Sequence, residues 1–113
     1  MQLRQVDPHE AVADGRVRGL SVGRDPEGRL VAKVAFENTG TTFLRPSGRV
    51  EVRDRTGQTV GSTPIEPFRV LPGATRELAV ALPEGLAPGV YVALAILDFG
   101  AEFLVAGQAG FEL

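Results

Sequence analysis

The chain has 113 residues, of which 43% are hydrophobic and 23% are charged, and its formal net charge is −2 at pH 7. This length fits one domain with a single hydrophobic core, and the composition excludes the low hydrophobicity of a disordered chain. Basic residues are interleaved with acidic ones, so we expect no basic face for nucleic acid. The absence of cysteine excludes disulfides, thiolate metal sites and a cysteine nucleophile.

The first residues are expected to form an arm or linker over 1–14, ahead of one domain over 15–113. Residues 1–14 show no strand periodicity and contain no apolar stretch of the signal-peptide kind. No part of the chain approaches the roughly 18 consecutive apolar residues that a membrane span needs. We therefore expect no membrane insertion.

Seven segments with strand character follow, separated by turns rich in Gly, Pro, Asn and Asp. The clearest is 30–37, in which one face carries Leu30, Ala32, Val34 and Phe36. The expected strands are 17–22, 30–37, 49–53, 58–62, 77–82, 90–97 and 103–113. Short strands in this number, with a turn about every 8 to 12 residues, are typical of a β-sandwich.

The stretch Leu86-Ala87-Pro88-Gly89-Val90-Tyr91 has the pattern of a tyrosine corner. In such a corner the Tyr ring enters the core, and its hydroxyl returns to the backbone a few residues upstream. We therefore assign structural roles to Pro88, Gly89 and Tyr91. Period 2 then places Ala93, Ala95 and Leu97 inward as well. The predicted fold is an all-β, immunoglobulin-like Greek-key β-sandwich of about seven strands.

Four sequence blocks carry a resemblance to a known family: 36–40, 46–57, 70–73 and 86–100. With the turns Asn38-Thr39-Gly40 and Leu71-Pro72-Gly73, they resemble bacterial immunoglobulin-like domains of exported proteins, which are grouped with fimbrial and pilus periplasmic chaperones. The resemblance implies a periplasmic, cell-surface or secreted location. A pilus chaperone resembles two such domains in tandem, and this chain has room for one, so chaperone activity is not carried over.

A second resemblance is to single-sandwich modules of the intracellular proteinase inhibitor type. These share an N-x-G turn followed by a D-x-x-G hairpin, as at Asn38 to Gly40 and Asp54 to Gly57. No exposed inhibitory loop can be identified in the sequence, so this alternative ranks lower.

Residues able to carry catalysis are scarce. His9 is the only histidine and has Asp7 and Glu10 beside it, a set that could ligate a metal, although a solvated arm is the favoured interpretation. The hydroxyls of Ser21, Ser47 and Ser62 have no other imidazole to activate them. The glycines precede no helix that could bind phosphate. We expect no catalytic, cofactor-binding or metal-binding residue, no cofactor and no enzyme.

Two loops form an alternative, ligand-binding site for a protein or a glycan. They span 39–45 and 98–103, and their candidate residues are Thr41, Thr42, Arg45, Asp98 and Glu102. Asp98 and Glu102 alone make a poor acid–base or Ca²⁺ pair. The basic residues Arg49, Arg53 and Arg55, separated by Glu51, could bind an anion, but a charged solvent face that discourages edge pairing is favoured.

The most informative feature is apolar. With Tyr91 inward, Val92, Leu94 and Ile96 point outward from the same strand, and soluble monomers rarely expose such a row. Two explanations for the cover of this row stay open. The row is covered from outside, by another domain, a protein partner or a second copy in a homodimer, or it is covered from within the chain, by neighbours on the last strand together with residues 1–14. A weaker patch of small outward residues comprises Val31, Ala35, Ala79 and Ala81.

The sequence therefore predicts a non-enzymatic structural or interaction domain of a larger bacterial envelope or secreted protein. Its partners would be neighbouring domains of the parent polypeptide or other proteins. The alternatives are a protein- or glycan-binding module using the loops 39–45 and 98–103, or a proteinase-inhibitor-like module.

Overall fold

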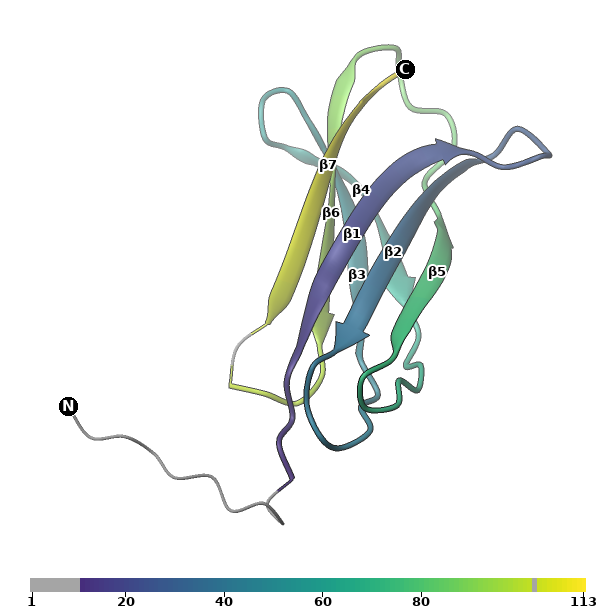
Figure 1. Ribbon diagram of the computed structural model, residues 1–113. Helices are drawn as coiled ribbons and strands as arrows, with labels where there is room; N and C mark the ends of the chain where they lie inside the picture. Colours follow the sequence, from purple (N-terminus) through teal and green to yellow (C-terminus); the bar gives the residue numbers. More distant parts are fainter. Residues whose placement is uncertain (1–10, 103) are drawn as a thin grey trace.

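The computed structural model describes residues 11–102 and 104–113, and this part of the chain is all-β (Figure 1). It contains seven strands: β1 (Gly15–Arg24), β2 (Leu30–Asn38), β3 (Ser47–Asp54), β4 (Thr59–Ile65), β5 (Thr75–Ala81), β6 (Val90–Asp98) and β7 (Val105–Glu112). The predicted all-β class with about seven strands is confirmed.

The strands form two antiparallel sheets, one of three strands in the order β1-β2-β5 and one of four in the order β4-β3-β6-β7. Figure 1 shows the sheets as two layers, and the chain changes layer after β2, β4 and β5. The β-sandwich is thus confirmed, while its Greek-key path stays a prediction. The pairs β2–β5 and β3–β6 join strands that are distant in sequence.

The core lies between the layers and is built from the alternate residues of the central strands. Phe36 is fully buried, with its ring 5.8 Å from that of Phe99 and 6.1 Å from that of Phe68. Burial of each such apolar side chain stabilises the fold by about 1.5–3 kcal/mol. The buried inward residues of β2, β3 and β6 are Leu30, Ala32, Val34, Phe36, Val50, Val52, Tyr91, Ala93, Ala95 and Leu97.

Two hairpin turns share one construction, which the D-x-x-G sequences explain. In each, the glycine N–H donates to the carbonyl of the aspartate three residues earlier, and the glycine takes a positive φ, 80° at Gly28 and 85° at Gly57. The carboxylates of Asp25 and Asp54 accept backbone N–H groups two and four residues ahead. These turns fix the register of β1–β2 and β3–β4.

The entry to β6 is held by Tyr91. Its hydroxyl donates to the carbonyl of Ala87 at 2.5 Å, and its ring stacks on Phe111 of β7 with 5.6 Å between centroids. The segment through Pro88 and Gly89 is thereby fastened to the core. This is the geometry that a tyrosine corner requires.

The edge strands differ from expectation in their bounds. β4, expected over 58–62, continues through Pro64 to Ile65, which is tolerated because an edge strand has one side without ladder bonds. β1 is longer than the expected 17–22 and has a register shift between Val17 and Gly19. Phe103, expected to begin the last strand, lies outside the described residues.

Candidate functional site

The outward face of the four-stranded sheet carries the predicted apolar row. Val92, Leu94 and Ile96 are half-buried and lie along β6. Across β3 they oppose Arg53, Glu51 and Arg49, and across β7 they oppose Gly110, Gln108 and Ala106. The row therefore runs between a charged cluster on one side and a strip of small or short polar side chains on the other.

The charged cluster is an internally paired triad. Arg49 Nε lies 2.7 Å from Glu51 Oε2, and Arg53 Nη2 lies 3.2 Å from Glu51 Oε1. Hydrogen bonds from Arg49 and then from Arg53 lower the pKa of Glu51. A partner covering this face would meet charges that already have partners, which reduces the cost of removing them from water.

Glu51 departs from the sequence expectation of a charged solvent face. It is only 8% exposed, because both arginines close over it and Leu94 lies opposite on β6. Arg55 lies apart in the exposed turn after β3. The sequence placed Arg49, Arg53 and Arg55 in one group, whereas the structure joins two of them to Glu51.

The first candidate ligand loop, 39–45, and the described part of the second, 98–102, lie at the same end of the sandwich (Figure 1). Several of their polar groups are engaged within the fold: Thr41 exchanges two hydrogen bonds with Val12, and the Thr42 carbonyl accepts from Asn38 Nδ2 at 2.8 Å. The Asp98 carboxylate accepts the N–H of Gly100 at 2.9 Å. Arg45 and Glu102 remain exposed. Hydrogen bonds within the fold thus hold both loops in place, and these bonds leave few polar groups free to bind a ligand.

Sequence reasoning missed an apolar pair at this loop end. Phe43 is 49% exposed and Leu71 is 55% exposed. They flank an isolated antiparallel bridge between Leu44 and Val70, and Arg69 lies 4.7 Å over the Phe43 ring. The sequence did contain a signal for this pair, because Phe43 and Leu71 are large apolar residues that lie inside predicted loops.

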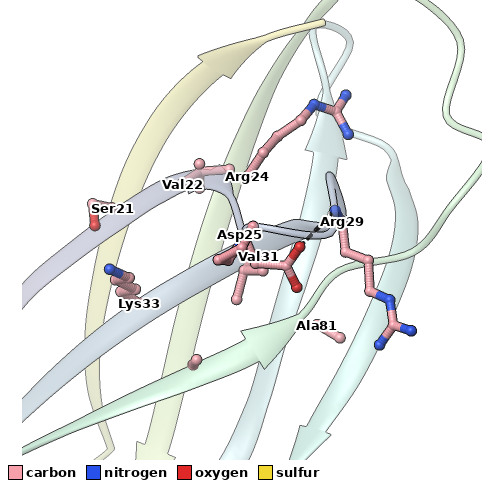
Figure 2. A pocket seen from close by; sticks show the side chains of 11 residues that line it. Ser21, Val22, Arg24, Asp25, Arg29, Val31, Lys33 and Ala81 are labelled. Carbon is pink, nitrogen blue, oxygen red and sulfur yellow. Dashed lines mark hydrogen bonds between the residues drawn. The ribbon is translucent and has the colours of Figure 1, made fainter.

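A shallow hollow of about 430 Å³ lies on the outward face of the three-stranded sheet (Figure 2). Its floor is made of two cross-strand rows, Ser21–Lys33–Ala79 and Gly23–Val31–Ala81, in which most side chains are small. Three basic side chains, Arg24, Arg29 and Lys33, line it together with Asp25, whose Oδ1 accepts two backbone N–H groups. Of the predicted patch, Val31, Ala79 and Ala81 are part of this floor, whereas Ala35 lies further along β2, opposite Gly19, and does not line it.

The catalytic candidates are not brought together. His9, Asp7 and Glu10 lie outside the described residues, and Ser21, Ser47 and Ser62 lie on three different strands. Over residues 11–102 and 104–113, no three His, Cys, Asp or Glu side chains gather in a metal-binding arrangement. The same residues include no helix long and apolar enough to cross a bilayer.

Comparison with known proteins assigns no family to the chain. No protein-family model matches the sequence, and no curated protein matches it significantly. Function is therefore inferred from the two outward faces, the loops and the sheet edges.

Proposed function

We propose that this domain is a non-enzymatic structural and interaction module whose contact surface is the outward face of the four-stranded sheet. The observation that carries the proposal is the row of Val92, Leu94 and Ile96, which lies only half-buried on that face. Apolar rows of this kind are covered in most soluble proteins.

The shape of the outward face of the four-stranded sheet suits a partner with a flat surface. Ala106 and Gly110 on β7 are small, so a second sheet or domain can approach the row closely from that side. On the other side, Arg49 and Arg53 extend over Glu51 and present aliphatic stems beside the row. An apolar centre with a polar rim is the usual composition of a protein interface.

The setting of the domain follows the same proposal. The sheet orders β1-β2-β5 and β4-β3-β6-β7 support an immunoglobulin-like sandwich. We place it in a bacterial envelope or secreted protein, where it would contact neighbouring domains, other proteins or a second copy of itself.

A second copy is the partner to test first, by light scattering over a concentration series with wild type beside Leu94→Asp. We expect wild type to self-associate and Leu94→Asp to be a folded monomer by circular dichroism, because a buried carboxylate opposes closure of the interface. Ser21→Asp, which adds the same charge on the other sheet, should associate like wild type. A monomeric wild type would exclude a second copy as the partner, and association unchanged by Leu94→Asp would contradict the β6 row as the contact surface.

Binding through the loop end is the second candidate function, favoured by the exposed Phe43 and Leu71. Here Phe43→Ser should abolish binding of a protein or glycan ligand and leave the assembly state unchanged. Leu94→Asp should have the opposite pattern, so the two variants separate the two functions.

A further inference from the structure

Of the four strands at the sheet edges, β5 is the least protected. β4 contains Pro64 and pairs with a register shift near Arg53, and β1 and β7 lie side by side (Figure 1). β5 pairs only with β2, and its stretch Leu78–Ala81 contains no charge, proline or register shift. Natural sheets usually carry one of these devices at an open edge, because unpaired backbone groups invite another strand.

The register identifies which backbone groups face the open edge. Leu82 N–H donates to the Leu30 carbonyl and Ala74 C=O accepts from Asn38, so the even-numbered residues of this stretch bond toward β2. Successive residues of a strand alternate between the two sides. The N–H and C=O of Glu77, Ala79 and Ala81 therefore point to the free edge.

Hollows flank this edge on both faces of the sheet. The hollow on the outward face is lined by Ala79 and Ala81 (Figure 2). A second hollow of about 370 Å³ lies between β5 and the end of β4, where Ile65, Phe68 and Leu78 contribute apolar side chains. It is lined by Ala79 and Ala81 as well. An added strand would alternate its side chains between these two spaces.

The two hollows differ in chemistry, and this difference specifies the occupant. The outward hollow has Arg24, Arg29 and Lys33 against one carboxylate, and Figure 2 shows Lys33 and Arg29 on opposite sides of it. The inner hollow is lined largely by apolar side chains. We propose that the β5 edge binds an extended segment of a partner protein by antiparallel strand addition, with acidic side chains on the outward face alternating with apolar ones on the inner face.

Charge disfavours a second copy as the occupant. Pairing of two β5 edges about a twofold axis would place both sets of Arg24, Arg29 and Lys33 on the same side of the joined sheet. Like charges gathered on one face oppose association. An acidic partner segment removes this repulsion and adds opposite charges in its place.

The test uses a capped heptapeptide of alternating Glu and Val, with a Lys–Val peptide as its matched control. We expect the Glu–Val peptide to bind the full chain, with shifts and hydrogen-exchange protection at the Ala79 and Ala81 amides in NMR spectra. The Lys–Val peptide should bind at least tenfold more weakly. Absence of binding, equal binding of both peptides, or shifts confined to other strands would overturn the proposal.

Backbone methylation of the peptide tests strand addition without altering the protein. In antiparallel pairing, a peptide residue directly opposite Ala79 has its side chain on the same, outward face of the sheet. The same peptide residue also directs its N–H group to β5. N-methylation at the Glu residues should therefore abolish binding, whereas N-methylation at the Val residues should preserve it. Equal effects of the two modifications would overturn strand addition.

Charge reversal in the protein tests the outward hollow. Lys33→Glu should weaken binding of the Glu–Val peptide at least tenfold, and Arg45→Glu, the same charge change at the loop end, should leave it unchanged. Lys33 is exposed, so the fold should tolerate the substitution. Leu94→Asp should also leave peptide binding unchanged, because this site is independent of the β6 face. Equal weakening by Lys33→Glu and Arg45→Glu would overturn the assigned position.

Discussion

The sandwich has two places where the edges of its sheets meet, and they are built differently. At one, β1 lies beside β7, and a Cβ placed on Gly107 would be only 2.6 Å from Val17 Cγ1. At the other, β5 stands apart from β4 with a hollow of about 370 Å³ between them. We call these the closed seam and the open seam.

Side-chain size accounts for much of the difference. Gly107 has no side chain, so Val17 and Leu20 of β1 pack directly against the backbone of β7. At the open seam, Pro64 leaves β4 without one N–H donor, and the small Ala79 and Ala81 of β5 direct their side chains to the outward face, so they do not fill the space. One seam is therefore sealed by packing, while the other keeps backbone groups available.

The largest expected effect is at the closed seam. Gly107→Val should lower the free energy of unfolding by about 1–3 kcal/mol, because the added side chain overlaps Val17. Urea unfolding measures the change, and adding Val17→Ala should restore part of the loss. Gly110→Val on the same strand is the control, since its nearest contact would be an ordinary 3.9 Å. Equal losses in the two valine variants would show that the seam is not closed by packing at Gly107.

A smaller effect should mark the open seam in amide hydrogen exchange. We expect the N–H groups of Glu77, Ala79 and Ala81 to exchange at least tenfold faster than those of Leu78 and Val80, a difference of about 1.4 kcal/mol. On β2, which has neighbours on both sides, alternate residues should be equally slow. Slow exchange at Ala79 and Ala81 in the free protein would mean that this edge is already covered.

The strands could be predicted from the sequence because their cause is local. Leu30, Ala32, Val34 and Phe36 occupy alternate positions, with Lys33 and Glu37 on the other face of the strand, and all four are buried as the alternation predicts. Local chemistry also indicated the turns at Gly28 and Gly57, where glycine takes a positive φ. Alternation and turn residues together specified the all-β class.

The seams could not be predicted because they depend on pairings distant in sequence. Nothing near Ala79 shows that β5 is an edge strand, since its single partner is β2, about 45 residues earlier. Glu51 likewise resembled a surface residue until Leu94 was placed opposite it across the β3–β6 pair. The small outward residues were visible in the sequence, but the hollow they line depends on three strands.

The smallest expected effect concerns how β4 is held beside the open seam. Glu51 joins Arg49 and Arg53 and accepts from Thr59 of β4 at 3.4 Å, so it ties β4 to its own sheet where β5 gives little support. The hydrogen bonds from Arg49 and then from Arg53 hold the pKa of Glu51 below its ordinary value of 4.5 in the folded state. The unfolded chain therefore binds the proton more readily, and the stability that Glu51 contributes is present above about pH 4.5 and lost as the pH falls below it.

Glu51→Gln tests this contribution by urea unfolding at neutral pH and at successively lower pH. The variant should have a lower free energy of unfolding than wild type at pH 7, and the loss should be smaller than that caused by Gly107→Val. The difference in free energy between variant and wild type should narrow as the pH falls through the folded-state pKa of Glu51. Asp54, whose pKa is lowered chiefly by a hydrogen bond from Thr56, titrates in both proteins and so cancels in the comparison. A gap that stays constant with pH would mean that Glu51 stabilises β4 through packing and not through its charge.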